Sequence, residues 1–251
     1  MKKKLIILFC ILAFLALMIT LNSAVFSVRS IKAVLKNADD PVLCQKIKDN
    51  VKIESRSIFF LDESKIIQNL SLSVPEAKIL KIERKFPDKL VIHAAKRARI
   101  GYIKYDNVYY IISEELTVID IINARPNNLI ELLILDDVDM SAAEKGRELE
   151  INDTAKNDLI NLFYCIKNIG EEYFKLVQKI NYVRKSGDFY LKTTSGVVIH
   201  LSFSERLQEK VQIAFSLYNY SPLYRSSGII SAYLDKDGKL KASYRPGEID
   251  F

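Results

Sequence analysis

The sequence is poor in residues that break regular structure and in residues that carry most chemistry. Among 251 residues there are 8 glycines, 6 prolines, 3 cysteines and 2 histidines, and tryptophan is absent. So little glycine and proline excludes a collagen-like or linker-like protein, and so little cysteine excludes a small disulfide-dense module. The net charge of +6 is spread along the chain, with no block of like charge after Lys4. This favours a solvated surface over a nucleic-acid-binding one.

Motifs that would indicate catalysis or cofactor binding are also missing. The chain has no glycine-rich phosphate loop, no GxSxG, no HExxH and no paired CxxC. His93 and His200 lie far apart within strand patterns, where a lone histidine is most often a packing residue. The acidic run from Asp136 to Asp139 lacks the glycine and closing glutamate of a calcium loop. We therefore expect no enzyme activity, no metal and no cofactor.

Apolar sequence is abundant at the N-terminus. Lysines at positions 2–4 precede an uncharged run, Leu5 to Leu21, whose apolar character continues to Phe26. That length predicts a membrane helix over residues 5–25. The lysines would keep the tail in the cytoplasm, with the bulk of the chain outside it. A cleaved signal peptide with a cut after Ala24 is the alternative, although the run is longer than a usual signal-peptide core.

Residues 26–97 alternate between strand-like and helix-like patterns. A strand is predicted from Val25 to Leu35, a helix after Asp39 or Asp40, and a second helix from Asp62. A hairpin with a Phe-Pro-Asp corner follows. This order is typical of a sheet covered on one face by two helices. The side chains expected to face inward are Leu43, Ile47, Val51, Ile66, Ile67, Leu70, Leu80, Ile82, Arg84, Leu90, Ile92 and Ala94.

Residues 98–251 predict a second region of mixed strands and helices. Three short alternating runs between residues 101 and 122 predict a meander. The segment 202–220 predicts a helix that begins with a Ser202/Glu205 capping box, and Asp237-Gly238 predicts the turn of a closing hairpin. Further strands are expected at 129–135, 176–184, 188–193 and 197–203, and a further helix at 151–170. The fold class is therefore α+β.

Cysteines and tyrosines give weaker signals. Cys44 and Cys165 fall in different regions, so we expect two buried thiols rather than a bridge. A tyrosine cluster could stack on a sugar or nucleobase, but half-buried sheet positions also favour tyrosine. Its members are Tyr102, Tyr105, Tyr109 and Tyr110.

This arrangement resembles the FtsQ/DivIB family of bacterial division proteins across nearly the whole chain. The most specific part runs from the helix start at Leu61-Asp62 through Pro75 to "IERKFPDKLVI", which contains the family's [RK]-[FW]-P corner. The N-terminal "FSVRSIKAVL", the later "GVVIHLSFSERLQEKVQIAFSLYNY" and the closing "GIISAYLDKDGKLKASYRP" extend the resemblance. The sequence departs from the family where Ser113 to Leu116 replaces an Asp-x-x-Gly turn.

The resemblance implies four parts. These are a cytoplasmic tail (1–4), a transmembrane helix (5–25), a POTRA domain of order β-α-α-β-β (26–97) and a beta domain (98–251) with a twisted, mostly antiparallel sheet. It further implies a non-enzymatic bitopic scaffold of the divisome, enriched at the septum, that regulates septal peptidoglycan synthesis. Expected partners are FtsB/DivIC-like and FtsL-like single-pass proteins, with other divisome components bound through the POTRA domain.

In the family the last strands receive an FtsB-like partner, and the free edge of a sheet invites such strand addition. A terminal hairpin that only completes the sheet is the alternative at this position. For the whole chain, the alternatives are an extracytoplasmic cell-wall-binding module or enzyme that uses the tyrosines, and a POTRA-bearing transport protein. The partner-binding residues expected by position are Ile230, Ala232, Tyr233, Leu234, Leu240, Ala242 and Tyr244.

Overall fold

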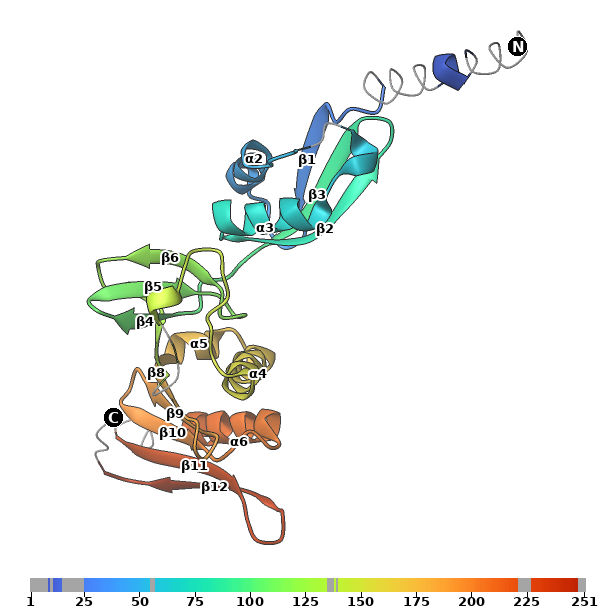
Figure 1. The fold of residues 1–251 in the computed structure, drawn as a ribbon. Coiled ribbons are helices and arrows are strands. Elements are labelled where there is room, and N and C mark those ends of the chain that lie inside the picture. Colours follow the sequence, from blue (N-terminus) through green and yellow to red (C-terminus); the bar gives the residue numbers. More distant parts are fainter. Residues whose placement is uncertain are drawn as a thin grey trace. The chain divides into compact units, whose positions relative to one another are not determined.

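The computed structural model of the chain describes residues 9, 11–14, 25–54, 57–134, 138, 140–220 and 227–247. The chain divides into two compact units, Met1–Arg97 (unit 1) and Ala98–Phe251 (unit 2), and each unit has its own sheet (Figure 1). The class is α+β, as expected. None of the helices in the described residues combines the length and apolarity needed to span a bilayer. The expected tail 1–4 lies outside the described residues, as does most of the expected helix 5–25.

Unit 1 contains a three-stranded sheet and two helices. Its elements are β1 (Ser30–Leu35), α2 (Pro41–Asp49), the 3-10 turn η1 (Ile58–Phe60), α3 (Glu63–Ser73), β2 (Ala77–Lys85) and β3 (Lys89–Lys96). The strand order is β1-β3-β2, with β1 parallel and β2 antiparallel to β3. Both helices cover one face of this sheet (Figure 1). Their buried side chains share one core with Leu90, Ile92 and Ala94 of β3.

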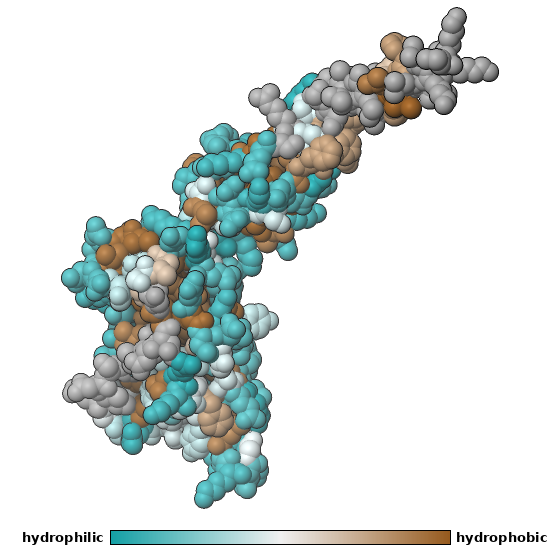
Figure 2. Space-filling view, viewed as in Figure 1, coloured by the Kyte–Doolittle hydropathy of each residue, from teal (hydrophilic) through white to brown (hydrophobic). Residues whose placement is uncertain are grey.

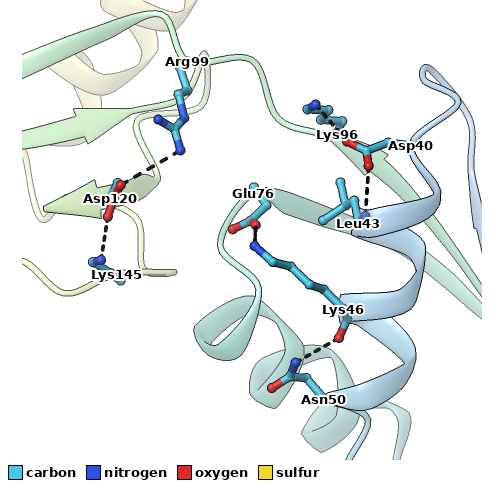
Figure 3. Close-up of polar contacts among 9 residues, drawn as sticks. All are labelled: Asp40, Leu43, Lys46, Asn50, Glu76, Lys96, Arg99, Asp120 and Lys145. Atoms are coloured by element: carbon cyan, nitrogen blue, oxygen red, sulfur yellow. Dashed lines mark hydrogen bonds and ion pairs between the residues drawn. The ribbon is translucent and has the colours of Figure 1, made fainter. Parts of the chain in front are cut away.

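Side-chain caps fix where the two helices of unit 1 begin. The Asp40 carboxylate accepts the Leu43 N–H at 2.9 Å and the Lys96 ammonium at 2.9 Å (Figure 3). These two donors, the Leu43 N–H first, lower the pKa of Asp40. Asp62 caps α3 in the same way by accepting the Lys65 N–H at 3.1 Å. The helix starts predicted at Asp40 and Asp62 are therefore confirmed.

The β2–β3 hairpin differs from the predicted alternation at one residue. The pairing shifts between Ile79 and Lys81, which marks a β-bulge. Past the bulge Ile82 is buried opposite Ile92, but Leu80 is 44% exposed. The expectation that Leu80 faces the core was therefore wrong, because the extra residue in the bulge turns its side chain outward.

Unit 2 is built on a nine-stranded sheet in the order β12-β11-β10-β9-β8-β7-β4-β5-β6. The pairs β10–β11, β7–β8 and β4–β7 are parallel, and the other five pairs are antiparallel. Its elements are β4 (Gly101–Tyr105), β5 (Val108–Ile112), β6 (Val118–Ile122), β7 (Ile130–Ile134), the 3-10 turn η2 (Met140–Ala142), α4 (Asp153–Ile169), α5 (Glu172–Leu176), β8 (Val177–Val183), β9 (Asp188–Thr193), β10 (Val197–Leu201), α6 (Leu207–Tyr220), β11 (Gly228–Leu234) and β12 (Leu240–Arg245).

Helices α4 and α6 pack against one face of the unit 2 sheet (Figure 1). Leu159, Leu162 and Phe163 of α4, together with Val211 and Phe215 of α6, enter a core filled by alternate residues of the strands.

Two sequence expectations fail beside this core. The short helix α5 was not predicted. Helix α6 begins at Leu207 rather than at a Ser202 capping box, because Phe203 and Arg206 have φ values of 21° and 52°, which no α-helix can accommodate.

Candidate partner-binding edge

The turn of the closing hairpin is stabilised by the Asp235 carboxylate, which accepts two backbone N–H groups. Asp235 Oδ1 accepts the N–H groups of Asp237 at 3.0 Å and Lys239 at 2.9 Å. Its Oδ2 lies 2.7 Å from the Lys241 ammonium. Lys241 and then the Lys239 N–H lower the pKa of Asp235. Gly238 supplies the left-handed position at φ 74°.

The hairpin is also tied to the helix side of the sheet. The Arg206 guanidinium donates to the Gly238 carbonyl at 3.1 Å and pairs with Glu209. At the other end the Tyr244 hydroxyl donates to the Ser227 carbonyl. A Cβ at Gly228 would meet the Tyr244 ring and the Arg245 carbonyl oxygen at 2.6 Å, so the close approach of the two strands requires glycine there.

Side chains of β12 alternate between half-buried and exposed. Leu240, Ala242 and Tyr244 are half-buried on the face covered by α6, opposite Leu234, Ala232 and Ile230. Lys241, Ser243 and Arg245 are exposed on the other face. Six of the seven residues expected to bind a partner therefore share the α6 face, and Tyr233 lies on the opposite face across from Lys241.

The backbone of β12 follows a strict alternation as well. The Asp235 N–H donates to the Lys239 carbonyl at 2.9 Å, which places this pair at a hydrogen-bonded position of the hairpin ladder. In an antiparallel ladder such pairs alternate with pairs whose N–H and C=O groups point away from each other. With the observed register, Lys241, Ser243 and Arg245 bond to β11. Leu240, Ala242 and Tyr244 therefore direct their N–H and C=O groups away from β11.

An independent contact agrees with this assignment. The carbonyl of Ala232, the partner of Ala242, accepts the Ser202 N–H at 3.2 Å on the β10 side, away from β12. Among the described residues, β12 pairs with β11 alone. The N–H and C=O groups of Leu240 and Ala242 thus lie along an edge of β12 that pairs with no other strand in the described part of the chain.

The opposite edge of the same sheet is protected. The Val118 N–H of β6 donates to the Arg147 carbonyl at 2.9 Å, and the Gly146 N–H donates to the Val118 carbonyl at 2.8 Å. Beside them Asp120 is held by Lys145 at 2.5 Å and by Arg99 at 4.0 Å (Figure 3). A covered, charged edge resists strand addition. Of the two edge strands of this sheet, β6 is therefore closed to a partner strand and β12 is open to one.

The other residues considered from the sequence do not form a reactive site. His93 lies 2.9 Å from Glu83 in unit 1, and His200 stacks on Tyr190 in unit 2 with ring centroids 4.5 Å apart. Both described cysteines are free thiols, Cys44 half-buried and Cys165 buried, and burial raises the pKa of Cys165 to about 11. Within the described ranges no group of three or more His, Cys, Asp or Glu could hold a metal. The acidic run 136–139, apart from Val138, lies outside them.

A hollow of about 1000 Å³ lies at the start of β7 and β8 in unit 2. Tyr102 borders it, 2% exposed, with its hydroxyl accepting the Arg125 Nε–H at 3.0 Å and its ring 5.6 Å from that of Tyr109. Three lysines also line the hollow and have no carboxylate partner among the described residues; they are Lys175, Lys179 and Lys192. We call this the lysine hollow.

The chain is thus a two-unit α+β protein whose described residues offer an open sheet edge but no catalytic cluster. Its sequence is similar to two proteins named "Cell division protein DivIB" from Clostridium botulinum. Identity is 24% over 226 residues for strain Hall and 23% over 227 residues for strain Loch Maree, covering 89% of this chain and 84% of each relative. The Clostridium tetani DivIB is 25% identical over 221 residues, covering 82% of this chain and 77% of the relative.

These relatives confirm the resemblance to the FtsQ/DivIB family. No family model matches the chain. Among solved structures, the major extracytoplasmic domain of DivIB from Geobacillus stearothermophilus covers 49% of this chain and 92% of its own, with 9% identity and a TM-score of 0.34. That likeness is too low to carry an argument, so the family resemblance rests on the sequence relatives.

Proposed function

We propose that this chain is a non-enzymatic, single-pass scaffold of the bacterial division machinery that captures a partner strand on β12. The relatives that share most of its length are cell division proteins. The observation that carries the proposal is the edge of β12, where Leu240 and Ala242 turn their amide groups outward. Such an edge offers hydrogen bonds to any extended peptide of suitable shape.

The proposed arrangement follows the expected parts of the chain. Residues 1–4 would lie in the cytoplasm and residues 5–25 in the cytoplasmic membrane. Unit 1 would serve as the POTRA domain (26–97) and recruit other divisome components. Unit 2 would serve as the beta domain (98–251) and bind FtsB/DivIC-like and FtsL-like proteins at the septum, thereby regulating septal peptidoglycan synthesis.

The two faces of β12 describe the partner that would fit. A strand added to this edge continues the sheet, so its alternate side chains lie beside Leu240 and Tyr244 on one face and beside Lys241 and Arg245 on the other. The first face is the one covered by α6, whose Ile213 and Leu217 are partly buried against the unit 2 core. The partner segment should therefore alternate apolar residues with acidic or polar ones.

The two tyrosines of the hairpin have different roles in the proposed contact. The Tyr244 hydroxyl is already bonded to the Ser227 carbonyl and its ring packs beside the core, so Tyr244 contributes chiefly through its backbone. Tyr233 stands on the exposed face beside Lys241 and is the tyrosine able to contact a partner.

Proline at Ala242 tests the proposal directly. The Ala242 N–H points to the open edge, so Ala242→Pro removes a donor for the partner without removing a bond to β11, and proline is tolerated at such edge positions. We expect the affinity for the extracytoplasmic segment of a DivIC-like partner to fall about tenfold or more, as measured by calorimetry.

Matched variants separate loss of docking from loss of folding. Ala242→Val keeps the N–H and should bind as the parent does. Ser243→Pro removes an N–H that bonds to β11 and should unfold the hairpin, which NMR spectra of the β11 and β12 amides would show. If Ala242→Pro keeps the hairpin folded and binds the partner with unchanged affinity, capture on β12 is wrong.

The lysine hollow supports a second candidate, an extracytoplasmic module or enzyme that binds a cell-wall polymer. Its lining holds Arg125, Lys175, Lys179 and Lys192 against one carboxylate, Glu131, which lies 3.5 Å from Arg125. This excess of positive charge and the bordering Tyr102 suit an anionic, sugar-containing chain. Of the expected tyrosine cluster, Tyr102 alone lines this hollow among the described residues, which weakens the stacking platform that this alternative needs.

A further inference from the structure

Unit 1 carries four exposed or half-exposed phenylalanines at the end of its sheet where β1 begins. The rings of Phe26 and Phe59 lie 5.0 Å apart, and those of Phe59 and Phe86 lie 5.2 Å apart. Phe59, Phe60 and Phe86 are 47%, 70% and 57% exposed. Figure 2 shows apolar side chains gathered at this end of unit 1. Phe60 follows Phe59 in the chain and borders the side chains of Glu54 and Lys65. We call Phe26, Phe59, Phe60 and Phe86 the phenylalanine cluster.

Packing of the unit 1 core does not explain this cluster. In η1 the Ile58 side chain is fully buried, and Leu61, which follows the turn, is also buried. The two residues between them, Phe59 and Phe60, face solvent because the turn directs only its flanks inward. Contiguous exposed apolar surface of this kind marks an interaction site in folded proteins.

The cluster is fastened to the point where the N-terminal segment enters unit 1. The Ile58 N–H donates to the Phe26 carbonyl at 2.8 Å, and Ser27 forms a β-bridge with Ser57. Phe26 directly follows the apolar sequence from Leu5 to Val25. Since each residue spans at most about 3.6 Å, an anchor that ends at Val25 holds Phe26 within a few ångströms of the membrane surface.

Basic side chains gather beside the cluster. Lys85 and Lys89 flank the corner that carries Phe86 and stand directly opposite each other across the hairpin, and the Lys85 ammonium lies 3.7 Å from the Glu83 carboxylate. Lys89 has no carboxylate partner among the described residues. The exposed Arg29 lies at the same corner, where its backbone N–H donates to the Asp88 carbonyl. Asp88 is the one carboxylate of the corner itself. Aromatic side chains among lysine and arginine are the combination that favours an anionic membrane interface.

We propose that the phenylalanine cluster docks into the headgroup region of the anionic bilayer in which the chain is anchored. This inference rests on the proposed single-pass anchoring. Phe59, Phe60 and Phe86 enter the interface, and Lys85 and Lys89 contact lipid phosphates. Unit 1 is then held against the membrane by a second contact besides the N-terminal segment.

The absence of tryptophan allows a clean test, because Phe60→Trp introduces a single reporter. The full-length variant is placed in vesicles of equal parts phosphatidylglycerol and phosphatidylcholine, with or without bromine on the upper acyl carbons. An interfacial side chain lies roughly 5–10 Å into the headgroup boundary, so brominated lipid should remove about half of the emission. Brominated vesicles of phosphatidylcholine alone should quench the tryptophan emission less, because they lack the anionic headgroups.

Control variants identify the source of the signal. Tyr220→Trp, at an 86% exposed position of unit 2, should show no quenching. Adding Lys85→Glu and Lys89→Glu to Phe60→Trp should lower the quenching in anionic vesicles. Anchoring is measured separately by washing the vesicles with alkaline carbonate, which an anchored chain resists. Release of the chain under these conditions would contradict the proposed membrane anchor. The docking proposal is wrong if the Phe60→Trp chain is anchored but its emission is not quenched. It is also wrong if the emission depends on protein concentration, because a second copy of the chain then covers the cluster.

Discussion

The turn between β5 and β6 shows how one side chain replaces a missing sequence motif. Ser113 is 1% exposed, and its hydroxyl accepts the N–H groups of Glu115 and Thr117, each at 3.2 Å. Leu116 takes the left-handed position at φ 58° while its side chain is fully buried. Ser113 thus accepts the hydrogen bonds in place of the family's aspartate. Leu116 takes the left-handed position in place of its glycine, and burial in the core holds this strained conformation.

Removal of the Ser113 hydroxyl should therefore cost stability. In Ser113→Ala two N–H groups lose their acceptor, and we expect the free energy of unfolding to fall by about 1–3 kcal/mol. Chemical denaturation of the full chain in detergent, followed by circular dichroism, measures the change. Ser216→Ala, at an exposed position of α6, is the matched control and should change stability by less than about 0.5 kcal/mol. Equal stabilities for the two variants would contradict this account of the turn.

Lys210 is a residue whose place no sequence pattern indicates. It lies in α6 with no exposed surface, and its ammonium donates to the carbonyls of Ser202 at 2.6 Å and Phe203 at 3.1 Å. Burial lowers its pKa. The stripe of Leu207, Val211 and Ala214 was predictable from apolar spacing, but that spacing does not indicate a buried lysine between them. Only the irregular loop before α6 creates acceptors for it.

At the scale of elements, the Asp235 turn gives the closing hairpin a defined response to pH. Because Lys241 and the Lys239 N–H lower the pKa of Asp235, its ionised form stabilises the folded hairpin. That stabilisation is complete above the ordinary carboxyl pKa of about 3.9 and is lost as the pH falls through the lowered pKa of the folded state.

Protection of the β11 and β12 amides against hydrogen exchange should therefore stay constant from about pH 6 to about pH 4 and decrease as the pH falls further, after correction for intrinsic rates. Asp235→Asn keeps an acceptor oxygen but loses the ion pair, so its protection should be lower at about pH 6 and nearly independent of pH. Asp237→Asn in the same turn should behave as the parent. A parent-like pH dependence in Asp235→Asn would rule out this carboxylate as the cause.

Element types were largely predictable, whereas their irregularities were not. Alternation and capping residues located β1, α2, α3 and the hairpins, because buried faces impose a period of two or of about 3.6 residues. The bulge at Leu80 and the five-residue helix α5 were missed, since each depends on tertiary packing over fewer residues than one full period. The seven expected edge residues included Leu240, Ala242 and Tyr244 but omitted the exposed Lys241 and Arg245. An alternation with a period of two shows that the strand has two different faces, but it does not show which face α6 covers.

At the scale of the whole molecule, scaffold and wall-binding module predict different behaviour in cells. A fluorescent fusion of the full chain should concentrate at mid-cell in the source bacterium, and Ala242→Pro should disperse it along the membrane. A deletion of the hairpin is a poorer test, because Ile230 and Ala232 are fully buried in the core of unit 2. If instead purified cell walls pellet the parent chain but not a Lys179→Gln, Lys192→Gln variant, the lysine hollow rather than β12 is the binding site.

The alternation along β12 has a consequence for how such an interface changes over time. The groups presented to a partner are peptide amides, which every residue except proline possesses. Leu240 and Ala242, which would present them, keep their side chains turned toward α6. Substitutions that preserve those small and apolar positions leave the outward amides in place, so the docking edge can persist while most other residues are replaced. Relatives that share only about a quarter of their residues with this chain could therefore retain the same mode of attachment.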